Sequence, residues 1–502
     1  MAEGRLDPIA LGVQAGRLRA VCDEMGAVLI RSAHSPNIKE RRDCSTALFD
    51  AGGELVMQAE HIPVHLGAMP AAVAAVLGED HSPGDAWVLN DPFRGGTHLP
   101  DITVISPVFC GDELVAFAAS RAHHADVGGP TPGSMPAGSR SLEDEGVVIE
   151  PSRLVRSGEL DEELIADLVG RMRAPSQRRA DLRAQLAANR AGAARVTELV
   201  ERIGLAALRD GMRETNDYAE RRTRARLAEI EDGERSTADV LEVVEADLEL
   251  RLRATVSDET LTLDFTGSSN QHDGNLNCPL AVTMSACIFA LRVLADPDVP
   301  PCAGAHRPLT VIAPEGSILN ARPGAAVVAG NVETSSRVAD LVLAAFGRAC
   351  GQGTMNNLTL GNERFTYYET LGGGQGACED ADGPSAVHVA MSNTLNTPIE
   401  ALELEFPLRA VTYALRRGSG GEGARRGGDG VVRELEALAD MEYSLLTERR
   451  RHAPPGAAGG GPGAPGANKL NGEPLGPKAG GGLRPGDRLR IETPGGGGHG
   501  QP

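Results

Sequence analysis

The stretch WVLNDPFRGGTHLPDITVISPVFCGDELVAFAASRAHHADVGG, residues 87–129, decides the fold of the chain around it. Residues 102–109 are β-branched and apolar enough to form one strand, and residues 114–120 read as its return. Between the two strands, Gly111 and Asp112 are typical turn formers. The stretch is therefore predicted to form a β-hairpin.

The ends of this hairpin carry two histidines and a carboxylate. A turn centred between the two turn formers places Asp101 opposite Ala122, with His123 one residue further on, so Asp101 and His123 come to the same end of the sheet. His98 lies on the loop that leads into the strand, because Pro100 drives the residue before it into an extended conformation. Two imidazoles and a carboxylate at a strand mouth suit a divalent metal with an open coordination position. The alternative is an ordinary polar loop with a capping aspartate and exposed histidines.

Composition narrows the class of protein. The chain has 502 residues, enough for two or three domains with cores of their own. Its 49 Lys and Arg against 69 Asp and Glu give a net charge of −20, which argues against binding a phosphate backbone. The start lacks the basic and apolar regions of a signal peptide, and no apolar run is long enough to span a bilayer. With eight cysteines and no Cys-x-x-Cys pair, we expect a reduced, cytoplasmic protein that binds neither nucleic acid nor membrane.

A second carboxylate precedes an earlier predicted strand, residues 44–49. Asp43 stands at the start of that strand, as Asp101 does in the hairpin, so it is a candidate for a further metal ligand. The alternative is that Asp43 caps a turn or pairs with Arg41 or Arg42.

Two more histidines, His61 and His65, lie four residues apart, but Pro63 between them favours a loop over a shared helix face. We expect them to line a pocket or cap the following helix rather than to bind a second metal.

The rest of the chain alternates helical and strand-like segments. Helical spacing of apolar residues predicts a helix over 8–31, a helical layer over 160–234, and helices over 279–294 and 338–346, the last capped by Thr334 or Ser335. Residues 237–266 alternate with a period of two and predict antiparallel strands. The Gly-rich stretch 372–376 could bind an anion or form a tight turn.

Together these segments predict an α+β, multi-domain protein with antiparallel sheets, a helical middle layer and a glycine-rich C-terminal tail. The predicted divisions are an N-terminal α+β domain with the metal site (residues 1–159), the helical layer (160–234), an α+β core (235–430) and a C-terminal segment (431–502). Within the last, the low-complexity part 453–482 should be poorly ordered, and residues 487–492 should form a closing strand.

Several multi-residue motifs occur in an order that resembles the hydantoinase B/5-oxoprolinase B family, the B subunits of ATP-dependent N-methylhydantoinases and related lactamases. They are SPNIKERRDCSTALFD, HIPVHLGAMP, NDPFRGGTHLPDI, SRAHHADVGG, DLRAQLAANR, LDFTGSS, GNVETSSRVAD, GTMNN, YYETLGGGQGA, VHVAMSNTLNTPIEALE and TPGGGG. The same superfamily includes the alpha-type subunits of acetone and acetophenone carboxylases.

This resemblance implies a hydrolase of cyclic amides, of the N-methylhydantoinase or 5-oxoprolinase type. A partner A subunit would bind ATP and phosphorylate the carbonyl oxygen of a hydantoin or lactam, and the two subunits would form a hetero-oligomer. The metal would be zinc, with manganese or iron as alternatives. Its ligands would be His98, Asp101 and His123, with Asp43 as a fourth.

Three nearby residues are candidates for catalytic roles. His124 or Asp126 could take or relay a proton beside His123, unless His124 points to the other face of its strand. Glu145 could position the substrate nitrogen, or it could be a surface carboxylate. Two other functions stay open: a subunit of an ATP-dependent ketone carboxylase, and a non-catalytic scaffold whose metal is structural.

Overall fold

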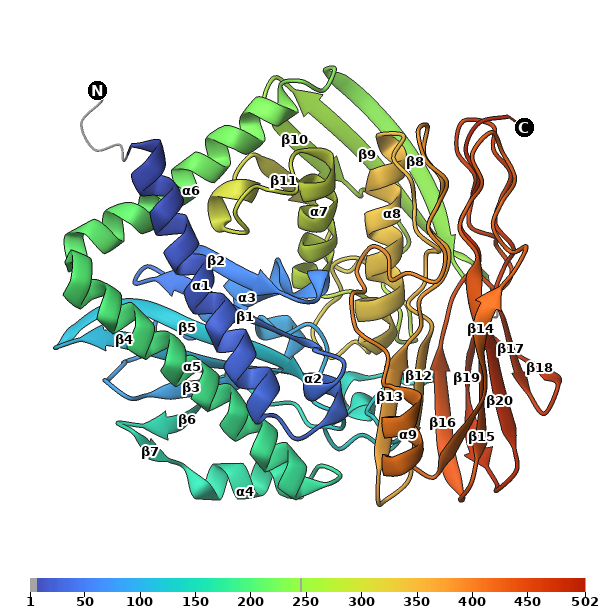
Figure 1. Cartoon of the computed structure of the whole chain (residues 1–502), viewed down its shortest axis with the longest axis horizontal. Coiled ribbons are helices and arrows are strands. Elements are labelled where there is room, and N and C mark those ends of the chain that lie inside the picture. The colour runs from blue at the N-terminus through green and yellow to red at the C-terminus, as the bar shows by residue number, and fades with distance from the viewer. Residues whose placement is uncertain (1–6, 244–245, 502) are drawn as a thin grey trace.

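The computed structural model describes residues 7–243 and 246–501, which form four β-sheets with helices packed on and between them (Figure 1). This is the mixed, multi-domain architecture with antiparallel sheets that the sequence predicts. Among the described residues, no helix combines the length and the apolar character that crossing a bilayer demands.

The first sheet has seven strands in the order β2-β1-β5-β4-β3-β6-β7. Its strands are β1 (Cys44–Asp50), β2 (Leu55–Glu60), β3 (Ala86–Leu89), β4 (Asp101–Cys110), β5 (Glu113–His123), β6 (Ser152–Arg156) and β7 (Glu159–Leu160). The predicted hairpin is thus confirmed as β4 and β5 at the centre of the sheet.

The register of this hairpin differs from the predicted one by a single residue. Near the turn, Cys110 pairs with Glu113 as expected, but a β-bulge next to Val108 adds one residue to the β5 side. From there to the end of the ladder, each pair shifts by one position, so Asp101 lies opposite His123 and not opposite Ala122. Because directly paired side chains share a face, the bulge points Asp101 and His123 into the same space.

Long helices cover one face of this sheet (Figure 1). The first begins where the side chain of Asp7 accepts hydrogen bonds from the backbone N–H groups of Ile9 and Ala10, with a proline at the first position. The predicted helices over 8–31 and within 160–234 are confirmed. The helices of this region are α1 (Pro8–Ser32), α2 (Pro36–Lys39), α3 (Ala68–Ala74), α4 (Glu162–Gly170), α5 (Pro175–Ile203) and α6 (Leu205–Leu227).

The second sheet, in the order β11-β10-β9-β8, packs with two helices around a large apolar core. The prediction that the side chain of Thr334 or Ser335 caps the second of these helices, α8, is wrong. Residues Gly330–Thr334 form a π-helical turn that runs straight into it, and the Thr334 hydroxyl donates to the carbonyl of Leu276 instead. The elements are β8 (Gly233–Leu241), β9 (Leu248–Ser257), β10 (Thr260–Asp264), α7 (Leu280–Leu294), β11 (Leu309–Ile312) and α8 (Ser335–Ala345).

The C-terminal part consists of two further sheets, in the orders β13-β12-β16-β19 and β14-β15-β20-β17-β18, with an apolar core between them. The closing strand predicted near the C-terminus is confirmed as β20. The elements are β12 (Asn357–Gly361), β13 (Thr366–Thr370), α9 (Ile399–Glu405), β14 (Leu408–Arg416), β15 (Gly430–Ala437), β16 (Met441–Leu446), β17 (Ala467–Leu470), β18 (Glu473–Leu475), β19 (Lys478–Leu483) and β20 (Arg488–Glu492).

Glycine-rich segments, expected to be poorly ordered within 453–482, pack instead against one another and lead into β17, β18 and β19. A Cβ on Gly496 would lie 2.0 Å from the carbonyl oxygen of Gln375, and one on Gly427 would lie 2.0 Å from that of Gly496. The 372–376 stretch belongs to this packing, since the N–H of Gly374 donates to the Pro494 carbonyl. We call the mutually packed segments 372–376, 418–430, 456–463 and 494–500 the glycine array.

Candidate metal centre

Three neighbouring strand ends meet at one point of the first sheet. Asp43 immediately precedes β1, Asp101 opens β4, and His123 closes β5, which lies between those two strands. The backbone N–H of His123 donates to the Asp43 carbonyl at 3.0 Å, which fixes the two residues side by side. Asp101 and His123 therefore lie on the strands themselves, Asp43 lies one residue before β1, and His98 comes from the loop before β4.

Two histidines face Asp101. Nε2 of His98 lies 3.3 Å from Asp101 Oδ2, and Nε2 of His65 lies 3.4 Å from the same oxygen. Ligand atoms of His98, Asp101 and His123 all lie within 4.8 Å of one another, as do those of Asp43, His65 and Asp101. All four residues predicted as metal ligands are thus brought together. His65, to which the sequence reasoning gave no metal role, joins them.

The donor atoms fit a metal ion. Nε2 of His98, Nε2 of His123 and Oδ1 of Asp101 are buried and have no hydrogen-bond partner. These three residues and Asp43 line a cavity of about 20 Å³, room for a body the size of a water molecule. Buried polar atoms are normally satisfied, so two imidazole nitrogens and a carboxylate oxygen left open at one cavity point to a ligand that binds them all.

Burial and mutual charge set the protonation of the cluster. Burial lowers the pKa of His65 and, much further, that of His123, so both imidazoles are neutral near pH 7 and keep a lone pair. Burial alone would raise the pKa of Asp101, but His98 and His65 hold it well below its ordinary value. Burial and the Asp101 charge raise the pKa of Asp43 to about 7.

The ring of His123 is fixed on several sides. Tyr368 from β13 stacks on the His123 ring, with the two ring centroids 4.6 Å apart. The Arg41 guanidinium lies over the Tyr368 ring, 4.4 Å from its centroid. His98 meets the His123 ring edge-on at 5.0 Å. The amide nitrogen of Asn37 lies 3.1 Å from Nδ1 of His123.

The structure places His124 away from the cavity. Strand alternation turns His124 to the opposite face, where its Nε2 lies 3.0 Å from the side-chain oxygen of Gln185 on α5. The role of His124 as a proton relay at the metal is therefore wrong, and the alternative, that it points to the other face, is confirmed. Burial lowers its pKa to about 4.

Asp126 and Glu145 are buried hydrogen-bond acceptors of the framework. Asp126 is paired with Arg173 at 3.0 Å and accepts the N–H of Gly128. Glu145 accepts the N–H groups of Val327 and Val328, at 3.0 Å each, and so ties its loop to the segment before α8. Neither residue lines the cavity. Glu145 is fully buried, so the surface alternative is wrong for it, and its contacts with the backbone of Val327 and Val328 give no support to a substrate-positioning role.

Sequence reasoning missed His65, Asn37 and Tyr368. His65 lies on the short 3₁₀ helix Pro63–His65, and the proline that argued against a helix face is the residue that opens this turn. Asn37 and Tyr368 lie within motifs already singled out, but nothing in their spacing connects them to residues far away in the chain. Their signal would have been a contact between distant segments.

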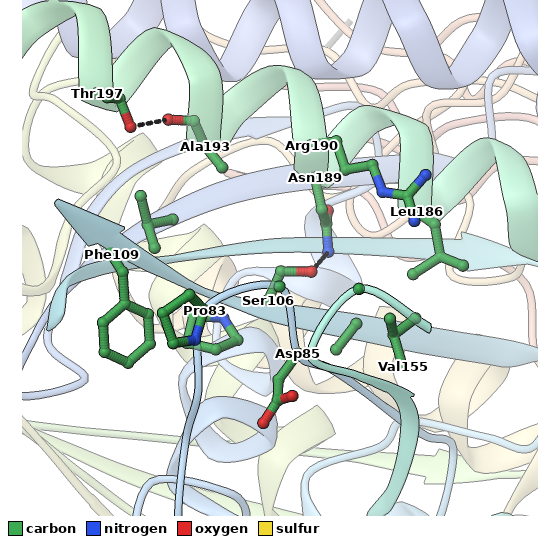
Figure 2. A pocket seen from close by; sticks show the side chains of 15 residues that line it. Pro83, Asp85, Ser106, Phe109, Val155, Leu186, Asn189, Arg190, Ala193 and Thr197 are labelled. Carbon is green, nitrogen blue, oxygen red and sulfur yellow. Dashed lines mark hydrogen bonds between the residues drawn. The ribbon is translucent and has the colours of Figure 1, made fainter. Parts of the chain in front are cut away.

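A more open groove of about 500 Å³ lies between α5 and the outer part of β3 and β4 (Figure 2). Asn189 donates to Ser106 Oγ at 3.3 Å across it, and Asp85 at its rim accepts the N–H of Ser157. The described residues that line this groove include no histidine or cysteine. Its polar side chains hold the helix on the sheet, so the cavity at the strand ends remains the candidate site.

A family model described as hydantoinase B/oxoprolinase matches residues 7–502. The chain belongs to this family. It is 41% identical to 5-oxoprolinase 1 of Arabidopsis thaliana over 100% of this chain and 42% of that protein. It is 31% identical to a protein of Pseudomonas sp. (strain NS671) that is named as a candidate B-type subunit of a D-/L-hydantoinase, over 90% of this chain and 81% of that protein. The chain thus spans about two fifths of the length of the 5-oxoprolinases it matches.

Two solved structures share the fold of this chain. The ATP-dependent caprolactamase from Pseudomonas jessenii aligns with a TM-score of 0.90 and 28% identity, over 99% of this chain and 91% of that one. A nucleotide-free acetone carboxylase aligns with a TM-score of 0.88 over 98% of this chain and 76% of that one. At 19% identity, the second likeness shows the fold alone.

Proposed function

We propose that this chain is the metal-bearing B-type subunit of an ATP-dependent hydrolase of cyclic amides, hydantoins or lactams, working with an A-type subunit that binds ATP. One observation carries the proposal. Two imidazole Nε2 atoms and one carboxylate oxygen, all buried and none with a well-formed hydrogen bond, belong to residues that line one small cavity. The family relationship to 5-oxoprolinases and a hydantoinase subunit supports the substrate class.

The division of labour follows from amide chemistry. An unstrained amide is a poor electrophile, and O-phosphorylation by the partner would turn it into an imidate-like species with a good leaving group. His98, Asp101, His123 and Asp43 would hold the divalent ion, zinc first, with manganese or iron as alternatives. When bound, such an ion lowers the pKa of its water to roughly 7 and so supplies a nucleophile at neutral pH.

The chain's own residues prepare the donor atoms. Nε2 of His123 has a free lone pair only if Nδ1 carries the ring proton. In that tautomer the Asn37 side chain would accept the Nδ1 proton with its amide oxygen, which requires the amide to be flipped by 180° from the orientation in which its nitrogen faces Nδ1. Asp101 is held from its other oxygen by the Thr97 hydroxyl and faces His65, whose Nδ1 lies 2.8 Å from the Ser45 hydroxyl. The contacts with Thr97 and His65 orient Asp101 before any ion arrives.

A structural, closed metal would need all its positions filled by protein. Turnover in the assay below separates a catalytic metal from such a structural one. The alternative function, a ketone carboxylase, is distinguished from the hydrolase by the substrates that the protein turns over.

Elemental mass spectrometry on the purified wild type, on His98→Ala/His123→Ala and on the control His452→Ala tests the proposal. His452 is an exposed imidazole paired with Asp247. We expect about one zinc, manganese or iron per chain in wild type and control, and none in the double variant. Wild type that folds but holds no metal after loading would overturn the proposal.

The metal-loaded chain is then assayed with ATP, the A-type subunit and, separately, hydantoin, 5-oxoproline, caprolactam, or acetone with bicarbonate. ATP-dependent ring opening, lost in His123→Ala while the subunits still assemble, supports the hydrolase. Turnover of the ketone alone would replace it with the carboxylase.

A further inference from the structure

Exposed apolar side chains gather in one short segment. Of the twelve large hydrophobic residues that are exposed in the described chain, five lie between residues 395 and 415. The two most exposed of these are Leu404 at 86% and Leu395 at 51%. We call these five residues the apolar shoulder: Leu395, Leu404, Val411, Tyr413 and Leu415. Large apolar residues exposed in one segment of a chain with a net charge of −20 point to an interaction site.

The shoulder is formed by connected elements. Tyr413 and Leu415 lie on the same face of β14, the edge strand of its sheet, and α9 packs against this strand. The Tyr413 hydroxyl donates to the side-chain oxygen of Asn396 at 2.9 Å, which ties the strand to the residue next to Leu395. In Figure 1, α9 lies in front of the lower part of β13.

The same segment closes the metal cavity. Met391, Ser392 and Thr394 form part of its wall. Arg41 donates to the Thr394 hydroxyl at 3.2 Å and accepts, through its carbonyl, the N–H of Leu395 at 3.1 Å. The wall of the cavity and the apolar shoulder are therefore adjacent along the chain.

The cavity beside the donors is too small to hold any cyclic amide. Its volume of about 20 Å³ holds a single water molecule, whereas a five-membered lactam ring has several non-hydrogen atoms. Seating a cyclic amide beside the donors therefore requires part of the wall to move. The wall segment begins at Ala386 and Ala390, whose φ angles of 56° and 50° are strained for alanine and persist only while surrounding contacts hold them.

Two amides supply such contacts. Asn393 donates to the carbonyl of His61, and Asn396 donates to that of Thr370, both at 2.9 Å. These two asparagines hold the wall segment in place.

We propose that the A-type, ATP-binding partner docks on the apolar shoulder and that docking displaces the wall segment, residues 386–396, to admit the activated substrate. The inference rests on the proposed function. The 5-oxoprolinases that match this chain carry about three fifths of their length outside the matched part, so a large polypeptide accompanies this fold in relatives. An O-phosphorylated amide reacts with water, so a direct transfer requires the mouth of the cavity to lie at the interface.

Binding is measured first, by biolayer interferometry between the metal-free chain and the A-type subunit of the source organism. We expect Leu404→Glu/Leu415→Glu to weaken binding at least tenfold. Ile9→Glu, at an apolar residue on α1 that is 79% exposed, should bind as wild type does. Equal binding by the double variant would refute the docking surface. Sedimentation of the chain alone that showed a dimer, lost in the double variant, would make the shoulder a self-interface and also overturn the proposal.

Opening is measured by the rate at which a chelator, dipicolinate, removes zinc from the loaded chain. Saturating A-type subunit should speed removal at least tenfold in wild type and not in Leu404→Glu/Leu415→Glu. Tyr413→Phe, which lacks the bond to Asn396, should lose zinc several-fold faster without the partner. An unchanged rate on partner binding would refute the displacement. If wild type holds no metal, the proposed function fails, yet the binding measurement still decides the docking surface.

Discussion

Asn37 offers a direct test of how the donor nitrogen of His123 is prepared. Asn37 is 3% exposed and its amide is 3.1 Å from Nδ1, so replacing it with leucine of similar size leaves that nitrogen without a polar partner. The ring proton can then move to Nε2, which removes the lone pair that faces the cavity. Loss of an outer hydrogen-bond partner of this kind weakens metal binding about 10- to 100-fold, or roughly 1.4 to 2.7 kcal/mol. Asn37→Asp, which accepts the Nδ1 proton more strongly, should keep or tighten binding.

The assay is a competition titration of zinc between the metal-free protein and a chromophoric chelator at fixed pH. Asn189→Leu is the matched control, because Asn189 is an equally buried amide that donates to the Val104 carbonyl outside the cavity. This control should lose stability without losing zinc affinity. Thermal unfolding of each metal-free variant separates the two effects. An Asn37→Leu protein that folds and binds zinc as tightly as wild type would refute the tautomer argument.

Three further predictions concern the framework around the site. Burial raises the pKa of Glu145 to about 8 from its ordinary 4.5. Because the unfolded state ionises first, the free energy of unfolding should fall as the pH rises from 4.5 to 8. Urea titrations should show a shallower fall in Glu145→Gln, and equal slopes would contradict the raised pKa of Glu145. Gly496→Ala should cost more than about 3 kcal/mol, because its Cβ would collide with the Gln375 carbonyl, whereas Gly482→Ala, with open space around it, should stay within about 0.5 kcal/mol by the same measurement. Asp126→Asn should lower the melting temperature and leave the metal content of the protein unchanged; loss of metal in a folded variant would place Asp126 in the site after all.

The two strands that carry the site could be predicted from local sequence, whereas the register between them could not. Strand propensity and a glycine turn were enough to predict β4 and β5 and to bring Asp101 and His123 to one end of the sheet. The bulge beside Val108 is set by packing of the finished sheet, and no residue type announces it. The prediction therefore placed the two donors one position out of register while assigning both correctly to the cluster.

Longer-range features were harder to predict. His65 reaches Asp101 across a turn, and Tyr368 reaches His123 from a distant strand, so neither contact leaves a periodic pattern. Glu145 was misjudged because a charged residue in a polar stretch reads as exposed until its backbone partners are known. The prediction of disorder near the C-terminus, made from its high glycine content, was also wrong. In the structure these glycines allow backbone segments to pack closely against one another.

The glycine array has a consequence for any mutational scan of this chain. Positions such as Gly496 and Gly427 should tolerate substitution as poorly as His98, although they touch no donor atom. A map of tolerated substitutions would then show two regions of equal severity, and ranking by severity alone would name the wrong one as the reactive centre. Soluble yield distinguishes them, since variants of the array should be lost as protein, while variants of the donors should accumulate as protein without metal.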